Sequence, residues 1–559
     1  MDEKASAIDI VRSYDEISIE NSDVISESLF FFQLHEKRFL FFAPDENDPS
    51  SRPDICLYND ELLDAPHIML NQSEYAGDEK LPKGIYRWIC LYEQNSVVWS
   101  LMGYEEKIYD AINRLIELLS MTEKEKEHEF QKEFLYYWNS ASKQEEKCSL
   151  YLQRDDEFSH LCIYHGNKEI RIIESSLMLT DINKVDKKNK REWVQHAELE
   201  AYFIPIIDSR EILPPRRGYQ WTQSDIRNIV YGKQIAHISE ETFVQLKNTI
   251  PKYQDTLLLF GIKTEQADIV FAAKLKLKQG SHRSLLEKIC NDVISVEPWR
   301  VTRRDYCYLS RQIGNDLSLV DNRILLVGAG SLGSYAAFEL VKNGTKRLTI
   351  YDGDKLEEEN VLRWVYGGIG RGTGKASTLS ILLQLLHPEI VVEAHDTNID
   401  SNFLEQEVSK NDMIIFTIGS TDQQLKFNKQ LKQQKCSVPV LYAWLEEGGT
   451  NSHILYADYR NKGCYECLYT DINGNHVSNR ARRNTQELSA RSMIQNGCGG
   501  TRAAYGTAVL LRTTAALLDI IGKINSGQIC KSTLWDITPG SVIASDLQIQ
   551  MEGCDCCGL

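Results

Sequence analysis

Residues 322–354 read NRILLVGAGSLGSYAAFELVKNGTKRLTIYDGD and decide the fold of the C-terminal part of the chain. An apolar run ends in a glycine-rich turn, a helical pattern follows, and a second β-rich run ends in Asp352. This order predicts a strand, a helix and a second, parallel strand. We therefore expect residues 301–559 to form an α/β domain with a doubly wound, Rossmann-like sheet.

The turn holds Gly328, Gly330 and Gly333 in a G-x-G-x-x-G pattern. Glycines let the backbone turn tightly and approach a phosphate, while the following helix N-terminus offers unpaired N–H groups. The pattern alone also fits an NAD-binding domain, in which Asp352 would hold the ribose hydroxyls. The turn thus predicts a nucleotide site without deciding between the two nucleotides.

Polar residues after the second strand favour ATP. Asn360, Arg363 and Lys375 add an amide and two cations beyond that strand. A hydride-transfer site has little use for them, whereas attack on the α-phosphate of ATP develops negative charge that must be neutralised. We therefore expect adenylation rather than NAD chemistry.

The motif order of this region resembles the ThiF and ubiquitin-activating enzyme superfamily. The motifs are SRQI (310–313), GAGSLGS (328–334), DGD (352–354), EN-x-x-R (359–363), GKA (374–376) and TD (421–422). The resemblance implies that Asp352 binds the ribose of ATP and that Asp422 holds Mg²⁺. The phosphate contacts that it implies are Asn360, Arg363 and Lys375. It also implies a homodimer through the adenylation domain, in which Arg311 reaches the phosphates of the partner subunit.

Two C-x-x-C pairs, Cys464 with Cys467 and Cys554 with Cys557, predict a structural Zn²⁺ site. Two residues between ligands let both sulfurs turn toward one ion. The site would tie the C-terminal tail to the domain, as the ThiF resemblance also implies. Cys556 leaves the fourth ligand open between Cys556 and Cys557, and free surface thiols are the alternative.

Cys498, in QNGCGGT (495–501), is the first candidate nucleophile. It precedes an apolar helical pattern, so we expect a helix N-terminus to lower the pKa of its thiol. A small buried residue in a tight turn is the alternative. The resemblance to activating enzymes implies that Cys498 accepts the acyl group from the adenylate.

Cys90, in GIYRWICL (84–91), is the second candidate. Strand alternation alone favours a core residue, but the order of this run, Trp99-Ser100 and a helical pattern resembles ubiquitin-conjugating enzymes, in which this cysteine carries the acyl group. The His-Pro-Asn tripeptide of that family is missing, and the nearest feature is Pro66-His67. His67 is thus a positioning residue or a plain structural histidine, and the group that stabilises the oxyanion stays open.

A chain of 559 residues is too long for one core. We expect an α+β conjugating-enzyme-like domain (1–140), an α+β linker or docking domain without a chemical motif (141–300), and the adenylation domain (301–559). This order resembles the bacterial fusion proteins of CBASS antiphage operons. That resemblance implies activation of the C-terminus of a cGAS-like nucleotidyltransferase and its transfer through Cys498 and Cys90 to a target amine.

Three other functions stay open at this point. The substrate could be a bacterial ubiquitin-like protein, or the chain could be a sulfur-carrier adenylyltransferase, which would not need Cys90. A non-catalytic scaffold is the third alternative, and the retained Arg311, Arg363, Lys375 and Asp422 argue against it.

The net charge of -17 argues against nucleic acid as a partner, because acidic surfaces repel phosphates. The basic run at 184–191 is interpreted as a solvated loop. The N-terminus lacks the apolar core of a signal peptide, and the apolar run at 506–521 is interrupted by Arg512 and Asp519. We therefore expect a cytoplasmic protein with no membrane partner, in which the fourteen cysteines are thiols and metal ligands.

Overall fold

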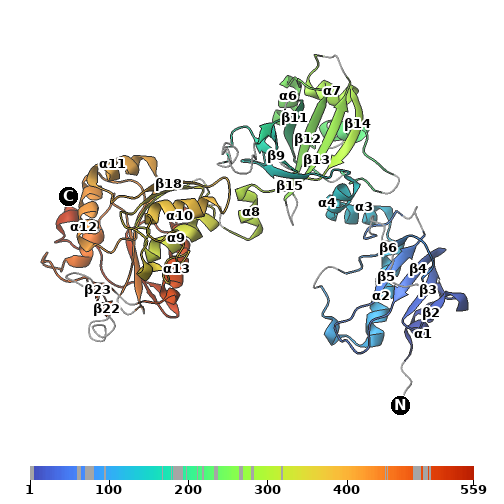
Figure 1. The fold of residues 1–559 in the computed structure, drawn as a ribbon, viewed down its shortest axis with the longest axis horizontal. Coiled ribbons are helices and arrows are strands. Elements are labelled where there is room, and N and C mark those ends of the chain that lie inside the picture. Colours follow the sequence, from blue (N-terminus) through green and yellow to red (C-terminus); the bar gives the residue numbers. More distant parts are fainter. Residues whose placement is uncertain are drawn as a thin grey trace. The chain divides into compact units, whose positions relative to one another are not determined.

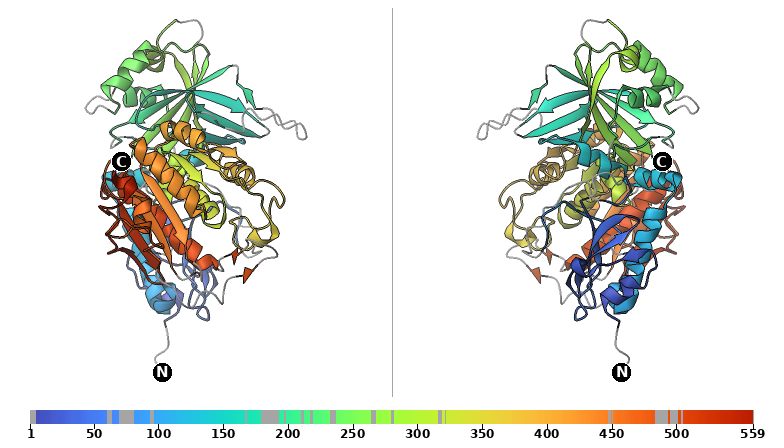
Figure 2. Two further views of the ribbon diagram at one scale, coloured as in Figure 1. Left: turned by 90° about the vertical axis from the view of Figure 1, so that its left-hand side faces the viewer. Right: turned by 90° about the vertical axis from the view of Figure 1, so that its right-hand side faces the viewer.

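The computed structural model describes residues 5–59, 64–68, 81–92, 96–166, 168–177, 179, 193–196, 198–209, 212–216, 219–231, 237–263, 268–278, 282–315, 319–320, 322–446, 449, 451–482, 493–494, 501–502 and 505–558. The chain forms two compact units. Unit 1 is Met1–Ser175 with Val194–Arg303, and unit 2 is Ser176–Trp193 with Arg304–Leu559. Figure 1 labels the elements along the chain, and Figure 2 gives two side views of them.

The first sheet of unit 1 is an antiparallel meander in the order β1-β3-β4-β5-β6, with β2 paired to β3. Helices α1 (Ala7–Arg12) and α2 (Tyr104–Ser120) cover its phenylalanine-rich face. Buried side chains recur at three- and four-residue spacing along α2, which makes the helix amphipathic. The strands are β1 (Ile17–Ser18), β2 (Val24–Ser26), β3 (Leu29–Leu34), β4 (Lys37–Phe42), β5 (Asp54–Tyr58) and β6 (Tyr86–Trp88).

The second sheet of unit 1 has nine strands in the order β14-β13-β12-β11-β8-β9-β7-β15, with β10 paired to β8. Helices α5 (Gln223–Val230), α6 (Glu240–Asn248) and α7 (Leu285–Asn291) contribute to one of its hydrophobic cores. The strands are β7 (Lys147–Tyr151), β8 (Ser159–His165), β9 (Glu169–Glu174), β10 (Val194–Gln195), β11 (Leu199–Ile206), β12 (Asp255–Lys263), β13 (Asp268–Leu277), β14 (Val293–Trp299) and β15 (Thr302–Arg303).

Two short helices, α3 (Glu123–Lys132) and α4 (Phe134–Ala141), connect these two sheets along the chain. The helical pattern after α2 is therefore broken into separate helices. Trp138 of α4 is fully buried, and its Nε1 donates to the carbonyls of Ala272 and Trp299 at 3.1 and 3.2 Å. Because Trp138 and Phe134 also pack into the core of the larger sheet, α4 is fixed to that sheet.

Unit 2 is built on an eight-stranded sheet in the order β18-β17-β16-β19-β20-β21-β24-β25. The five strands from β18 to β20 are parallel, and the strands beyond β20 are antiparallel. The strands are β16 (Arg323–Val327), β17 (Arg347–Tyr351), β18 (Val391–His395), β19 (Met413–Phe416), β20 (Val440–Leu445), β21 (Ser452–Ala457), β24 (Thr533–Thr538) and β25 (Ser541–Ala544). The prediction of a Rossmann-like α/β fold is confirmed for this region.

Helices cover both faces of this sheet. Alternate side chains of β16 point to opposite cores: Ile324 and Leu326 lie with α9, α10 and α13, whereas Leu325 and Val327 lie with α11 and α12. The helices are α8 (Tyr306–Gln312), α9 (Ser331–Lys342), α10 (Lys375–Gln384), α11 (Ser401–Lys410), α12 (Thr421–Gln433), α13 (Thr507–Asn525) and α14 (Asp555–Gly558). A ligand site is expected where the strand order reverses, at the carboxyl ends of β16 and β19.

Within the described residues, no helix is both long enough and apolar enough to cross a membrane. The apolar run that begins at Gly506 is the helix α13, which buries one face against the sheet of unit 2.

Candidate functional site

The turn after β16 is held by hydrogen bonds from outside itself. Gly328 has φ +104, a left-handed conformation that favours glycine. Its carbonyl accepts the Thr417 hydroxyl at 2.8 Å, and the Ala329 carbonyl accepts Trp364 Nε1 at 2.9 Å. Asp352 Oδ2 accepts the N–H of Ala329 at 2.6 Å. These hydrogen bonds thus fix the conformation of the turn without a ligand.

The other two glycines serve different purposes. A Cβ on Gly333 would lie 1.9 Å from the Gly328 carbonyl oxygen, so glycine lets α9 pack against the turn. A Cβ on Gly330 would meet no atom of the described residues within 4 Å. Gly330 is the N-cap of α9, makes no side-chain cap, and lines a cavity. The room beside Gly330 therefore suits an anionic ligand at the helix N-terminus.

The cavity has a volume of about 690 Å³, within the usual range for small-molecule sites. It opens at the carboxyl ends of β16, β17, β19 and β20. Its lining includes the cations of Arg363 and Lys375 and several aromatic rings. Its lining residues are Gly330, Ser331, Leu332, Asp354, Lys355, Glu357, Asn360, Arg363, Lys375, Thr417, Ile418, Gly419, Thr421, Gln424, Ala443, Trp444, Leu445, Tyr465, Tyr469, Asn479 and Tyr505.

The three predicted phosphate contacts meet in this cavity. Arg363 Nε is buried without a hydrogen-bond partner among the described residues, and its guanidinium carbon lies 5.5 Å from the centroid of the Tyr505 ring. Lys375 is buried, and its Nζ lies 2.8 Å from Asp354 Oδ2. Asn360 is also buried, and its Oδ1 accepts the N–H of the residue three positions earlier. A polyanion is the ligand that best satisfies these donors.

The remaining predicted residues of the nucleotide site do not line the cavity. Asp352 supports the turn, and burial raises the pKa of its carboxyl, although hydrogen bonds from the N–H groups of Asp354 and Ala329 oppose that shift. Asp422 lies exposed in the first turn of α12, and Arg311 lies in the last turn of α8. Their predicted roles in ribose binding, Mg²⁺ binding and contact with a partner subunit stay predictions.

Sequence reasoning missed the aromatic residues that line the cavity and one amide. Gln424 is 2% exposed; its Nε2 donates to the Ile418 carbonyl at 2.8 Å, and its buried Oε1 has no partner among the described residues. Tyr465 stacks on Tyr442 at 4.6 Å and also lines the cavity. Tyr465 stands inside the C-x-x-C motif, but no spacing rule indicates where the residue between two ligands points.

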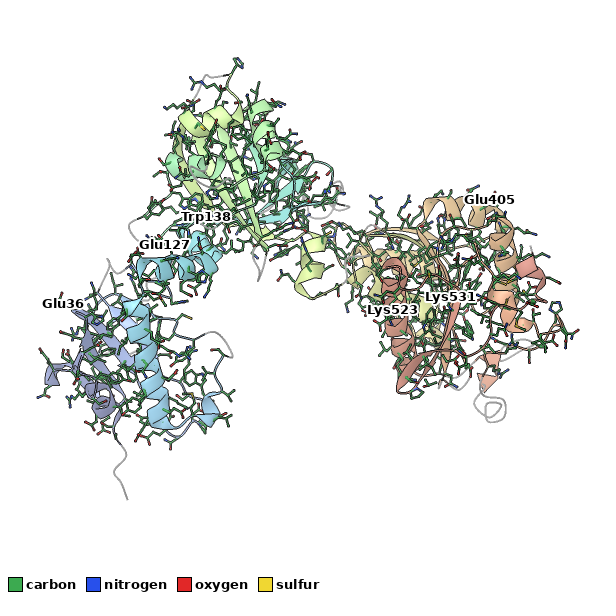
Figure 3. All side chains as sticks on the ribbon, turned by 180° about the vertical axis from the view of Figure 1, so that it is seen from behind. Glu36, Glu127, Trp138, Glu405, Lys523 and Lys531 are labelled. Carbon is green, nitrogen blue, oxygen red and sulfur yellow. The ribbon has the colours of Figure 1, made fainter. Side chains whose placement is uncertain are left out.

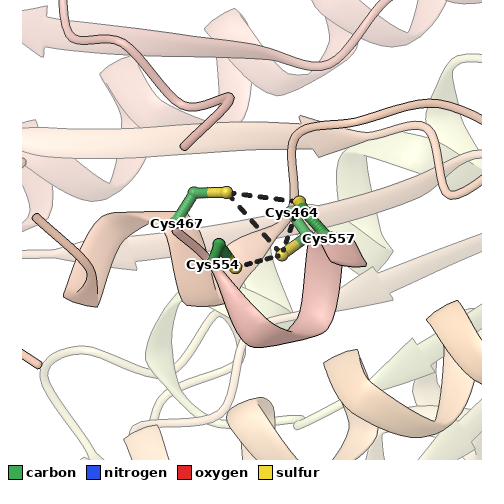
Figure 4. A group of neighbouring side chains, drawn as sticks. All are labelled: Cys464, Cys467, Cys554 and Cys557. Atoms are coloured by element: carbon green, nitrogen blue, oxygen red, sulfur yellow. Dashed lines mark hydrogen bonds between the residues drawn. The ribbon is translucent and has the colours of Figure 1, made fainter. Parts of the chain in front are cut away.

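Four cysteines form a buried cluster in unit 2 (Figure 4). The sulfurs of Cys464, Cys467, Cys554 and Cys557 all lie within 4.8 Å of one another. Neighbouring pairs are 3.4 to 3.9 Å apart. A tetrahedral Zn²⁺ with bonds of about 2.3 Å places its sulfurs about 3.8 Å apart. The four thiols therefore fit a Zn²⁺ ion, which would join α14 to η5 (Tyr465–Tyr469).

Cys556 stands outside this group. Its sulfur lies 3.1 Å from Nδ2 of Asn428, a fully buried residue of α12. Asn428 Oδ1 accepts the N–H of Tyr465 and the hydroxyl of Tyr459, both at 2.8 Å. The geometry thus gives Cys557, rather than Cys556, the fourth position, and Asn428 connects the cluster to the cavity wall.

Cys90 lies in unit 1, directly after β6, and its side chain is exposed. It lines a second cavity of about 470 Å³ together with His67, Glu117, Glu129 and residues of α2 and α3. The N–H of Cys90 donates to the His67 carbonyl at 2.8 Å. The structure therefore brings together the two residues that the sequence singled out in this region.

Cys498 lies outside the described residues. Helix α13 begins only at Thr507, with Gly506 as its N-cap. Cys498 thus precedes the start of this helix by nine residues, and its predicted role as acyl acceptor with a lowered thiol pKa stays a prediction.

The sequence profile of the ThiF family matches residues 310–547. Ubiquitin-like modifier-activating enzyme 5 of Bombyx mori is 23% identical over 207 residues, 35% of this chain and 51% of that protein. The ATP-dependent ubiquitin transferase-like protein Cap2 of Pseudomonas aeruginosa is 26% identical over 228 residues, 39% of this chain and 38% of that protein. This chain therefore carries a ThiF domain similar to ubiquitin-activating enzymes.

The chain spans about half the length of these curated relatives or less. Among solved structures, E. coli MccB with ATP is similar at 17% identity and a TM-score of 0.33, over 43% of this chain and 68% of MccB. The matched ThiF family is one of adenylating enzymes, and the matched residues include the cationic side chains that line the cavity of unit 2.

Proposed function

We propose that unit 2 binds ATP and Mg²⁺ in the 690 Å³ cavity and adenylates the C-terminal carboxylate of another protein. The observation that carries this proposal is that the buried Nε of Arg363 has no hydrogen-bond partner among the described residues and lines one cavity with Lys375 and with Gly330 at the uncapped start of α9. The cationic side chains and the uncapped helix start both favour negative charge in this cavity, and the space at Gly330 leaves room for it.

The proposed reaction begins with attack of a carboxylate oxygen on the α-phosphorus of ATP. An oxygen–phosphorus bond forms, the bond to the β-phosphate oxygen breaks, and pyrophosphate leaves. Arg363 and Lys375 neutralise the charge that develops on the phosphates. Lys375 would exchange its contact with Asp354 for a phosphate oxygen, which leaves the exposed Asp354 carboxylate in water.

The proposed transfer then passes through two thioesters. The Cys498 thiolate attacks the acyl carbon and AMP leaves; the Cys90 thiolate attacks that thioester and the Cys498 thiolate leaves. An amine of the target finally attacks the acyl carbon held on Cys90, the Cys90 thiolate leaves and the nitrogen loses a proton, so that an amide forms without further ATP. The exposed Cys90 thiol in its own cavity, within a helix-covered antiparallel sheet, supports a conjugating role for residues 1–140.

The proposed substrate is the C-terminal tail of a cGAS-like nucleotidyltransferase, and the alternative is a ubiquitin-like protein. The expected domain order and the similarity to Cap2 favour the first, whereas the similarity to activating enzyme 5 favours the second. Each substrate would place its tail beside the aromatic residues that line the cavity.

A homodimer through unit 2 belongs to this proposal. Apolar side chains stand exposed on α8 and α10, which supports a surface for a second copy. This exposed apolar surface consists of Leu309 (41% exposed), Ile313 (69%), Ile381 (62%), Leu385 (76%) and Leu386 (43%). The N–H of Tyr306 donates to Glu389 Oε1 at 2.8 Å, so the start of α8 lies beside the segment after α10. Arg311 shares α8 with Leu309 and would reach the partner's cavity.

The test of adenylation is ATP–pyrophosphate exchange in the presence of each candidate protein. We expect Arg363→Gln to lower the exchange rate by a factor of about 10² or more, as loss of one transition-state donor does. Arg371→Gln is the matched control, because Arg371 is exposed, pairs with Glu358 and does not line the cavity. Equal exchange by both variants would remove the phosphate role of Arg363.

The relay is tested by intact mass and non-reducing gels after incubation with ATP, Mg²⁺ and the candidate protein. We expect the wild type to form a thioester and Cys498→Ala to form none. In Cys90→Ala we expect the acyl group to remain as a thioester on Cys498. Pyrophosphate release without a thioester on either cysteine would leave only adenylation, and Cys90 would have no part in the reaction.

A further inference from the structure

His67 is held from three directions. Its Nδ1 lies 3.0 Å from Glu133 Oε1, its Nε2 lies 3.3 Å from Glu129 Oε2, and its backbone N–H donates to the Tyr137 hydroxyl at 2.9 Å. Glu129 belongs to α3, Glu133 joins α3 to α4, and Tyr137 belongs to α4. Both ring nitrogens are therefore engaged, and His67 is not an available general base.

The backbone of His67 is unusual as well. It has φ +63, a left-handed conformation that few residues other than glycine adopt. Such a conformation persists where the surroundings over-determine it, and it is common at functional sites. Hydrogen bonds to Glu133 and the nearby carboxylates raise the pKa of His67 despite its burial, which favours the charged ring between the two glutamates.

The segment fixed in this way leads directly to the candidate nucleophile. The His67 carbonyl accepts the N–H of Cys90, and Ile68 forms a β-bridge with Ile89. Residues 67–68 thus lie alongside residues 89–90. A displacement of His67 would move the backbone that carries the Cys90 thiol.

We propose that His67 is a positioning residue for Cys90, held in place by Glu129, Glu133 and Tyr137 of the segment that joins the two sheets of unit 1. The inference rests on the proposed acyl transfer at Cys90, and it gives a structural role to α3 and α4. In this proposal those helices orient the Cys90 segment, at a site that lacks the His-Pro-Asn tripeptide.

The same segment is bound to the larger sheet. Trp138, labelled in Figure 3, donates from α4 to two carbonyls of that sheet. Arg216, which follows β11, contacts Asp64 at 3.3 Å and lies over the Phe130 ring of α3 at 5.2 Å. Asp64 lies three residues before His67 in the sequence. Residues of the middle region therefore reach the Cys90 segment through α3 and α4.

The experiment uses the full chain and two readouts. The first is hydrogen–deuterium exchange of the peptide that contains the Cys90 amide. In Glu133→Gln and in His67→Asn, which retains a residue tolerant of the left-handed conformation, we expect that amide to exchange about tenfold faster. Glu127→Gln is the matched control: Glu127 is an exposed residue of α3 with no ion pair among the described residues, and Figure 3 labels it.

The second readout separates positioning from a loss of fold. With a candidate tail substrate, we expect both variants to charge Cys498 as the wild type does and to discharge the Cys90 thioester about tenfold more slowly. Exchange at the Cys90 amide that stays at the wild-type rate in both variants would overturn the inference. If the wild-type chain forms no thioester, the proposed function has failed, and the exchange rates still decide whether His67 positions the Cys90 segment.

Discussion

At the scale of single residues, Gly330 and Gly333 separate ligand binding from folding. Gly330 has an ordinary φ of -69, so alanine fits its backbone, and the new methyl group would point into the cavity. In Gly333→Ala the methyl group would meet the Gly328 carbonyl, which is backbone and cannot move aside cheaply. We expect Gly330→Ala to keep the Tm of the wild type and to lose nucleotide binding.

For Gly333→Ala we expect the opposite result: a lower Tm and retained nucleotide binding. Overpacking of this kind costs about 1–3 kcal/mol, so its Tm should fall by several degrees. Thermal unfolding and calorimetric titration with ATP measure the two effects. Normal ATP affinity in Gly330→Ala would show that the phosphates lie elsewhere.

A second residue-scale prediction concerns a buried ionic group that the proposed reaction does not use. His453 lies between Asp536 Oδ1 at 2.8 Å and Glu446 Oε1 at 2.6 Å, and all three side chains are buried. Burial lowers the pKa of His453, but hydrogen bonds to Asp536 and Glu446 outweigh it and raise the pKa above the usual 6.5. A raised pKa means that the stabilisation is fully present below pH 6.5 and is lost as the pH rises through the folded-state value.

We therefore expect His453→Gln to destabilise unit 2 by about 3–5 kcal/mol near pH 6, because it leaves buried carboxylates without their cation. The difference from wild type should shrink as the pH rises above 6.5 and through the raised pKa of the folded state. Urea unfolding across this range measures it, with the exposed His476→Gln as control. A difference that is independent of pH would mean that His453 is neutral in the folded protein.

At the scale of elements, the C-terminal tail is held by the cysteine cluster. Helix α14 contains Cys556 and Cys557, but only the Cys557 sulfur joins Cys464, Cys467 and Cys554. We expect one Zn²⁺ per chain in the wild type, its retention in Cys556→Ser and its loss in Cys557→Ser. Elemental analysis and the Tm measure these effects. Loss of Zn²⁺ from Cys556→Ser alone would show that Cys556, and not Cys557, is the fourth ligand.

The elements also show how far the sequence could predict this site. The glycine turn and the paired cysteines were predictable because each follows from short-range spacing. The contact of His67 with Glu133 spans 66 positions, and that of Asn428 with Cys556 spans 128. Such contacts depend on how helices pack, so no local pattern indicates them. For the same reason, the sequence placed Asp352 beside the nucleotide, whereas its carboxylate also supports the turn.

At the scale of the whole molecule, the proposed relay needs more than one active centre. The proposed dimer determines whether one chain or two chains build each nucleotide site. If Arg311 completes the cavity of a second copy, a monomer is an incomplete adenylating enzyme. The exposed apolar surface of α8 and α10 is the place to break that contact, because a charge there costs little in a monomer and much in an interface that excludes water.

We expect Leu385→Asp to halve the molar mass measured by light scattering on a size-exclusion column, from two chains to one. ATP–pyrophosphate exchange should fall with it, and by a similar factor in Arg311→Gln, which should stay dimeric. Ile472→Asp is the matched control, since Ile472 is 79% exposed in the same unit but lies outside this surface. A wild-type chain that is monomeric yet fully active would remove both the dimer and the role of Arg311, and would confine adenylation to the residues that line the cavity of a single unit 2.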